Sequence, residues 1–223
     1  LKNLLAAARF SPRLFADLVI AEAGRKVRPH ASHRLIVRLL LACIRERKNL
    51  LVQAPPEHGK TSIFIPVLSW LIGHDMRLKI GMVSRDKDLV EENLIRARKV
   101  LTSPTCCSVF PAIVPDYGRS AADRGEWSKS KLYLVDQDTP AFEAFSLFGA
   151  SEGHRLDFIW ADDCVTRACL YSEAERRHVA SALFDTFANR LTDNGIILVT
   201  NNCWHREDPM HQMLASPSYA ALW

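Results

Sequence analysis

The chain has 223 residues, of which 48% are hydrophobic and 24% charged, a balance typical of one soluble globular domain. Lysine and arginine number 29 against 25 acidic residues, and this mild basicity permits a nucleic-acid partner without requiring one. The six cysteines form no C-x-x-C pair, which argues against a zinc site or a disulfide framework. The longest apolar stretch, residues 63–72, is too short to cross a bilayer. The chain begins at Leu1 and stops at Trp223 without a polar tail, so we expect a fragment of a longer protein.

Two helices are expected at the start of the chain. Ser11 as N-cap and Pro12 at the first helical position begin a helix that ends near Gly24. A second helix is expected over about 32–48, where apolar residues recur at helical spacing. Residues 1–48 would therefore form a helical lead-in that packs on the core of one domain.

The sequence LLVQAPPEHGKTSIF carries the clearest functional signal. An apolar run at 50–52 predicts a buried strand, and after a stiff turn an apolar helix begins at Thr61. In a phosphate-binding loop, backbone N–H groups of such a turn surround the polyphosphate, Lys60 reaches the β- and γ-phosphates and Thr61 holds Mg²⁺. Ala54 stands where the first glycine of G-x-x-x-x-G-K-[ST] belongs. The alternative is an ordinary strand-to-helix turn with a solvated lysine.

The rest of the chain alternates strands with helices, which predicts an α/β fold whose largely parallel sheet is covered on both faces. Further strands are expected at residues 78–84, 131–135, 144–148, 157–161 and 195–200. Further helices are expected from Asp86 to Leu101, from the Ser172 and Glu175 capping box towards Asn189, and around Pro209. A polar, irregular loop is expected over residues 111–129.

Paired acids follow the apolar strand in LDFIWADDCV. A P-loop enzyme needs one carboxylate for the Mg²⁺ shell, here Asp162, and a second to orient the attacking water, here Asp163. Thr200, at the end of the next strand, is positioned to contact the γ-phosphate. The alternatives are a solvated Asp-Asp turn and an ordinary strand end. Trp204 and His205 fit a structural role better than a catalytic one.

An arginine beside the transferring phosphoryl group would stabilise its developing charge, and a neighbouring subunit can supply it. Arg155, in the loop that enters the acidic strand, is the first candidate, and Arg119 and Arg124 come next. The alternative for each is an ordinary surface arginine. The residues expected to bind ATP are Pro55, Pro56, Glu57, His58, Gly59, Lys60, Thr61, Ser62 and Thr200.

With these motifs placed, the chain resembles the N-terminal ATPase domain of a phage large terminase subunit. The segment APPEHGKT resembles the family's P-loop, commonly written PPRHGKS, and IGMVSRDKDLVEENLIRARKVLTSP resembles the strand and helix after it. SEGHRLDFIWADD resembles the lead into the second acidic motif. ILVTNNCWHREDP resembles the coupling strand and the T-x-W-H-x-D-D-like turn, with Thr200, Trp204, His205 and Asp208 matching. The four motifs stand in the family's order.

The resemblance implies a RecA-like P-loop fold of the additional-strand type, in which a strand lies between the P-loop strand and the acidic strand. It implies Mg²⁺-dependent ATP hydrolysis coupled to the pumping of double-stranded DNA into a prohead in the host cytoplasm. It also implies a ring of five identical subunits that docks on the portal protein and is assisted by a small terminase subunit.

Three features depart from the family pattern. Glu57 stands where many terminases carry arginine or glycine, and Asp163 where many related ATPases carry glutamate. The family's nuclease domain has no room in this chain, so nuclease activity is not expected from it. The rival functions are another nucleic-acid translocase or helicase, a small-molecule kinase that uses the same loop, and an inert binding module. A second RecA-like domain would favour the helicase, and a lid segment the kinase; neither is visible in the sequence.

Overall fold

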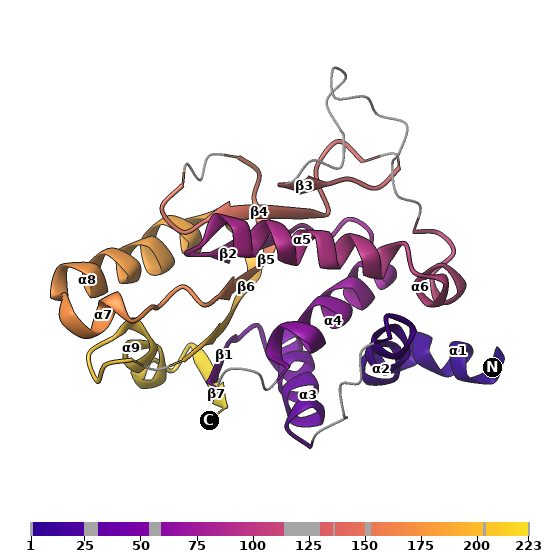
Figure 1. Cartoon of the computed structure of the whole chain (residues 1–223), viewed down its shortest axis with the longest axis horizontal. Coiled ribbons are helices and arrows are strands. Elements are labelled where there is room, and N and C mark those ends of the chain that lie inside the picture. The colour runs from indigo at the N-terminus through magenta and orange to yellow at the C-terminus, as the bar shows by residue number, and fades with distance from the viewer. Residues whose placement is uncertain are drawn as a thin grey trace.

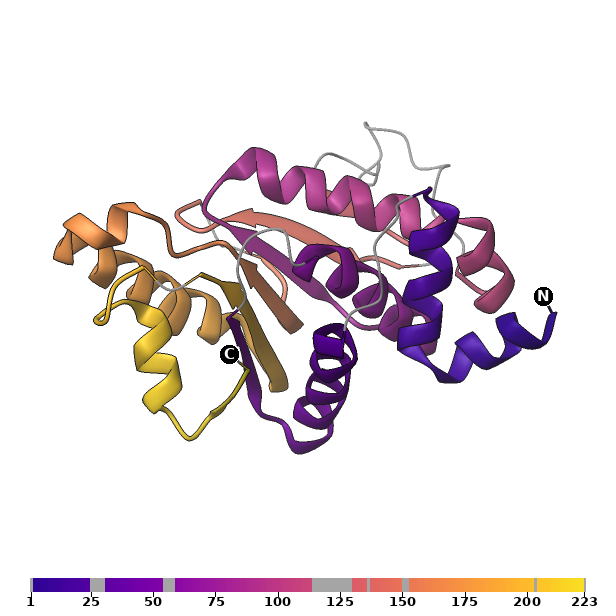
Figure 2. The same ribbon diagram turned by 60° about the horizontal axis from the view of Figure 1, so that its bottom comes forward.

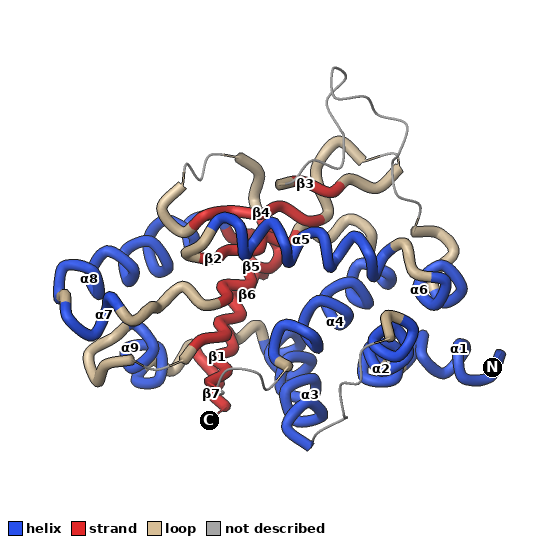
Figure 3. Tube along the Cα trace, viewed as in Figure 1, coloured by secondary structure: helices blue, strands red, loops and turns tan. Residues whose placement is uncertain are grey.

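The computed structural model describes residues 2–24, 31–53, 59–113, 130–135, 137–149, 153–202 and 204–222. Its centre is a seven-stranded sheet, drawn in red in Figure 3, with the strand order β3-β4-β2-β5-β6-β1-β7. In chain order the strands are β1 Asn49–Gln53, β2 Ile80–Ser84, β3 Lys131–Leu132, β4 Phe142–Ser146, β5 Leu156–Asp162, β6 Leu191–Asn201 and β7 Tyr219–Leu222. The β3–β4 pair is antiparallel and every other pair is parallel.

Helices cover both faces of this sheet. On one side lie α1 Lys2–Phe10, α2 Pro12–Glu22, α3 Ala31–Glu46, α4 Lys60–His74, α5 Lys87–Leu101 and α6 Pro104–Val109 (Figure 1). On the other lie α7 Ala168–Tyr171, α8 Glu173–Ser181 and α9 Pro209–Ala215. Figure 2 separates the indigo and magenta helices of the first half from the orange and yellow helices of the second half.

The period-two alternation of the strands divides the core between these two layers. In β1, Leu50 and Val52 pack with α1–α6, whereas Leu51 packs with the C-terminal helices. In β5, Trp160 points to the α4 side, where its ring lies 5.9 Å from that of Phe64. Both faces of the central strands are therefore apolar, as expected for a buried parallel sheet.

Strand β6 lies between the P-loop strand β1 and the acidic strand β5, which confirms the additional-strand arrangement. The expected helix caps are also present. Ser11, Asp86 and Ser172 each accept a backbone N–H with the side chain at the start of α2, α5 and α8. The fold class predicted from the sequence is thus confirmed.

Several element boundaries differ from the prediction. The strand expected at 144–148 begins at Phe142, because Phe142 pairs with Ile80 and both side chains are fully buried. The strand expected at 131–135 is only two residues long, and it pairs antiparallel at the edge of the sheet. The helix expected to run to Asn189 continues from α8 as a π-helical turn (Ala182–Phe187) and a 3-10 turn. Helices α1 and α6 and strand β7 were not predicted.

Within the described ranges, no helix is long and apolar enough to cross a membrane.

Candidate nucleotide-binding site

The start of helix α4 provides the first part of the site. Gly59 caps the helix in the left-handed conformation, with φ of 70°, which glycine adopts without strain. Lys60 follows with only 7% of its surface exposed, and Thr61 comes next in the first turn. The N-terminus of an α-helix favours anions because its N–H groups and dipole point outward. Ala54 and the predicted nucleotide ligands Pro55–His58 lie outside the described residues.

Two threonines hold the carboxylate of Asp162 from different elements. Thr61 Oγ1 donates a hydrogen bond to Asp162 Oδ2 at 3.1 Å, and Thr200 Oγ1 donates to Asp162 Oδ1 at 2.5 Å. Trp160 Nε1 in turn donates to Thr200 Oγ1 at 2.8 Å. Asp162 and Thr200 are register partners on β5 and β6, and Asp162 lies two residues beyond Trp160, so all three share the face under α4. The sequence placed Asp162 and Thr200 at the ends of two strands, and the structure brings these two ends to one edge of the sheet.

Burial raises the pKa of Asp162 from 3.8 to about 6, and the charge of Asp163 adds to this effect. Hydrogen bonds from Thr200 and Thr61 and the positive charge of Lys60 act in the opposite direction. A carboxylate that is 3% exposed is therefore held ionised at neutral pH by hydroxyl donors and a nearby ammonium group. A divalent cation bound to this carboxylate would neutralise its charge and so offset the free-energy cost of burying it.

The donor set fits Mg²⁺. The Thr61 hydroxyl and the Asp162 carboxylate are hard oxygen ligands that already lie within hydrogen-bond distance of each other. Mg²⁺ sites in phosphate-transferring proteins typically use one or two carboxylates and complete the shell with phosphate oxygens and water. Among the residues that the structure describes, no group of three or more His, Cys, Asp or Glu side chains is placed to hold a metal ion. Binding of Mg²⁺ through one carboxylate, a hydroxyl and phosphate oxygens does not need such a group.

Asp163 leaves the sheet at the same edge. Its φ of 49° is in the left-handed region, which aspartate tolerates better than most residues, and its N–H donates to the Thr200 carbonyl at 3.0 Å. Burial raises its pKa, and the charge of Lys60 lowers it. The turn thus places a second, half-buried carboxylate directly beside Asp162.

Asn201 is a contributor that the sequence interpretation did not single out. It is fully buried, and its Oδ1 accepts from the Val165 N–H at 2.8 Å while its Nδ2 donates to the Val165 carbonyl at 2.8 Å. This pair of bonds ties the chain after Asp163 to the end of β6. The only signal in the sequence was the polar TNN that ends the strand, and it did not indicate a bond to residue 165.

The remaining candidates lie away from the Asp162 cluster. Arg155 precedes β5, at the opposite end of that strand from Asp162, and its Nη1 donates to the carbonyls of Asn189 and Leu191 at 2.8 and 2.9 Å. Arg155 therefore lies apart from Asp162, and its role in a neighbouring subunit stays a prediction. Arg119 and Arg124 lie outside the described residues.

The turn after β6 has a structural explanation. The N–H groups of Trp204 and His205 donate to the fully buried Asp208 carboxylate at 2.9 and 3.2 Å. Asp208 also caps α9, since its side chain accepts from the Met210 N–H at 3.0 Å. These bonds come from backbone N–H groups and show that Asp208 holds the turn, so the structural role expected for the Trp204 and His205 side chains stays a prediction.

The strand order and the contact between the start of α4 and the end of β5 define the class: this is a P-loop fold of the additional-strand type. Several solved structures share this fold with the chain. The large terminase of bacteriophage HK97 superposes with a TM-score of 0.58 at 11% identity, over 92% of this chain and 43% of that one. The ATPase domain of the Thermus phage P74-26 large terminase gives 0.53 at 14%, over 91% of this chain and 82% of that one.

A third similar structure is Dbp5 of S. cerevisiae, bound to ADP among other partners, with a TM-score of 0.56 at 12% identity over 93% of this chain and 51% of that one. No protein-family model and no curated protein matches the sequence. At these identities the structures show a shared fold, that of phage terminase ATPase domains and related P-loop proteins. The chain spans about half of Dbp5 and less than half of the HK97 terminase.

Proposed function

We propose that the chain is a Mg²⁺-dependent ATPase whose site lies where α4, β5 and β6 meet. The observation that carries the proposal is the hydrogen-bonded set formed by Thr61, Asp162 and Thr200. It joins the phosphate-binding end of a helix to an ionisable carboxylate at the sheet edge where ligands of open α/β folds bind. An inert module would have no need to keep an ionisable carboxylate beside a buried lysine.

Each residue then has a role in the reaction. The first turn of α4 binds the phosphates, with Lys60 reaching the β- and γ-phosphates and the Ser62 N–H completing the turn. Thr61 and Asp162 hold Mg²⁺, which neutralises charge that develops on the phosphate oxygens. Asp163 orients the water that attacks the γ-phosphate. Thr200 contacts the γ-phosphate, so strand β6 senses whether that phosphate is present. Pro55, Pro56, Glu57 and His58 are proposed to complete the phosphate-binding turn.

We propose further that ATP hydrolysis by this chain drives double-stranded DNA into a prohead. The support for this proposal is the order of the four terminase-like motifs in the sequence, together with the shared fold of the phage packaging proteins. The motor would be a homo-oligomeric ring, a pentamer, working in the host cytoplasm with a portal protein and a small terminase subunit. In such a ring, Arg155 would act on the nucleotide of the neighbouring subunit.

The main rival is another nucleic-acid translocase or helicase, because Dbp5 shares the fold. A small-molecule kinase is the weaker rival, and nothing in the described residues favours it.

Hydrolysis is tested with Asp163→Asn, with Asp193→Asn as a matched control on an exposed position of β6. Because asparagine cannot accept a proton from water, we expect phosphate release to fall by about 100-fold or more, with ADP affinity nearly unchanged. The control variant should behave as the wild type. Hydrolysis at the wild-type rate by Asp163→Asn would assign the water-orienting role to another residue.

The motor role is tested by DNA packaging. Wild-type protein with portal-bearing proheads, double-stranded DNA and ATP should render the DNA resistant to nuclease, and Asp163→Asn should not. ATP-dependent strand separation without packaging would instead assign the chain to the helicase class.

A further inference from the structure

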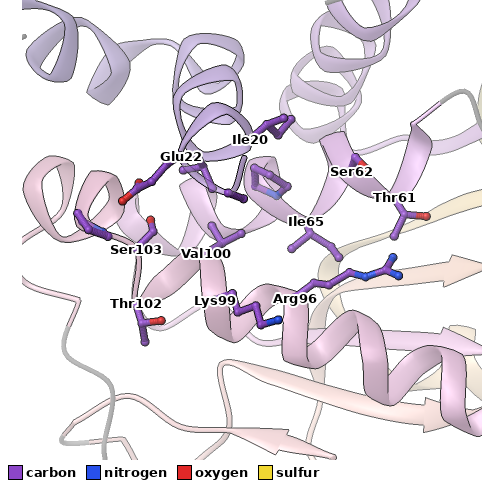
Figure 4. Close-up of a pocket in the computed structure, with 14 residues that line it drawn as sticks. Ile20, Glu22, Thr61, Ser62, Ile65, Arg96, Lys99, Val100, Thr102 and Ser103 are labelled. Carbon is purple, nitrogen blue, oxygen red and sulfur yellow. The ribbon is translucent and has the colours of Figure 1, made fainter. Parts of the chain in front are cut away.

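A pocket of about 460 Å³ lies between α2, α4, α5 and α6, on the side of α4 that faces away from the sheet (Figure 4). It begins at Thr61 and Ser62 in the first turn of α4, where the proposed function places the phosphates. From there it extends to Ala23 at the end of α2 and to Ser103 at the start of α6. Its size falls in the range of small-ligand sites, about 300–1,000 Å³.

The walls of this pocket are mostly apolar. Val19 and Ile20 of α2 face Ile65 and Pro66 of α4, and Val100 of α5 closes the side between them. An apolar lining of this kind suits an aromatic ring, because burying the ring removes apolar surface from water. A phosphate-bearing ligand whose other end is an aromatic heterocycle would thus match the two ends of the pocket.

Pro66 removes one hydrogen bond from the first part of α4. Proline has no N–H, so Pro66 supplies no helical hydrogen bond to the carbonyl of Ser62, four residues earlier in α4. Both residues line the pocket. The Ser62 carbonyl, in the first turn of α4, therefore lacks the N–H donor that residue 66 would otherwise supply. The ribose hydroxyl groups of a nucleotide are hydrogen-bond donors that such a carbonyl could accept from.

Charged side chains also line the pocket: the cations Arg96 and Lys99 of α5, and the carboxylate of Glu22 at the end of α2. Figure 4 shows the Arg96 side chain extending from α5 towards the end of the pocket where Thr61 lies. Its guanidinium is held on the rim of the pocket by hydrogen bonds to Asn93 Oδ1 and Glu92 Oε2, each 3.3 Å long. A guanidinium in this position can pair with a phosphate oxygen or stack on a planar base.

We propose that this pocket binds the nucleoside half of the bound nucleotide, with Arg96 contacting the phosphate nearest the sugar. The proposal rests on the proposed ATPase function. The base and sugar would contact the pocket residues of α2, α4, α5 and α6. Many terminases carry an arginine in the phosphate-binding loop at the position of Glu57. In this chain Arg96 of α5 would provide a positive charge in its place.

The test compares ADP with inorganic pyrophosphate, which shares the phosphates of ADP but has no nucleoside. Ala23→Trp places an indole in the pocket from an exposed position whose φ and ψ of −71° and 4° suit any residue. The control is Ala21→Trp, on an exposed position of α2 that is not among the lining residues of the described pocket. Calorimetry should show ADP binding weakened by about tenfold or more in Ala23→Trp, with pyrophosphate binding unchanged within about twofold. The control should bind both ligands as the wild type does.

A second variant pair keeps the proposal testable if Ala23→Trp folds poorly. Arg96→Gln and Lys87→Gln each remove the cation of one i,i+4 ion pair on α5, but only Arg96 lines the pocket. Arg96→Gln should weaken the binding of both ADP and pyrophosphate by about threefold or more, because both ligands carry the phosphate that Arg96 contacts, and Lys87→Gln should leave both affinities unchanged. The pocket assignment is overturned if wild type binds ADP, Ala23→Trp keeps the wild-type affinity ratio, and Arg96→Gln binds both ligands as tightly as the wild type does. Failure of the wild type to bind ADP and pyrophosphate would overturn the proposed function itself.

Discussion

Replacing Asp162 with asparagine removes one charge from the centre of the site while keeping its shape. The Asp162 carboxylate accepts hydrogen bonds from both Thr200 and Thr61. In Asp162→Asn the amide oxygen can still accept from Thr200, and the amide nitrogen can donate to the Thr61 hydroxyl, which rotates to accept. The variant therefore isolates the electrostatic cost of holding a buried carboxylate in the nucleotide-free chain.

The size and sign of that cost follow from the pKa. Burial raises the pKa of Asp162 from 3.8 to about 6, so the folded chain binds this proton more tightly than the unfolded chain does. Below pH of about 4 both states are protonated, and the free energy of unfolding falls as the pH rises through about 4 to 6. Above pH of about 6 the cost is constant. At about 1.4 kcal/mol per pKa unit, it amounts to about 3 kcal/mol.

Urea unfolding of the nucleotide-free protein, with a metal chelator present, measures this difference. We expect Asp162→Asn to raise the free energy of unfolding by about 1–3 kcal/mol at a pH of about 7.5 and to change it little at a pH of about 4. Asp193→Asn, on an exposed position, should show no such gain. A loss of stability at the higher pH, or an equal effect at both pH values, would refute the electrostatic reasoning.

Three other substitutions test residues other than Asp162, two of them close to it and one, Arg155, at the far end of β5. Thr200→Val removes the donor to Asp162 and the acceptor for Trp160, so unfolding should require about 1–3 kcal/mol less, and phosphate release should fall more than ADP affinity. Asn201→Ala leaves the Val165 N–H without its side-chain acceptor, and chemical denaturation should show a loss of about 1–3 kcal/mol; an unchanged midpoint would contradict this. Arg155→Ala should leave ADP binding intact but suppress hydrolysis in the assembled ring, and normal ring hydrolysis would move the trans-acting role elsewhere.

The order of the elements was predictable because each signal was local. The helix starts at Ser11, Asp86 and Ser172 depend on a side chain that bonds an N–H two or three residues later. The meeting of Asp162 with Thr200 was also predictable, because the carboxyl ends of neighbouring parallel strands lie at one edge of the sheet.

The features that were missed depend on contacts between distant segments. The start of β4 at Phe142 is set by its pairing with Ile80, and the role of Asn201 by its bonds to Val165, 36 residues away. No local pattern contains either contact. The pocket beside α4 was missed for the same reason, because four helices from separate parts of the first half of the chain form its walls.

Lys60→Ala tests the central claim, nucleotide hydrolysis at the end of α4, most directly. The measurement is phosphate release from ATP by the full-length protein with portal-bearing proheads and DNA, alongside circular dichroism as a check of folding. The wild type should turn over ATP in these conditions. Lys60→Ala should fold but show no turnover above background, because the phosphates lose their buried ammonium partner. Wild-type turnover by a folded Lys60→Ala protein would contradict the assignment of this site.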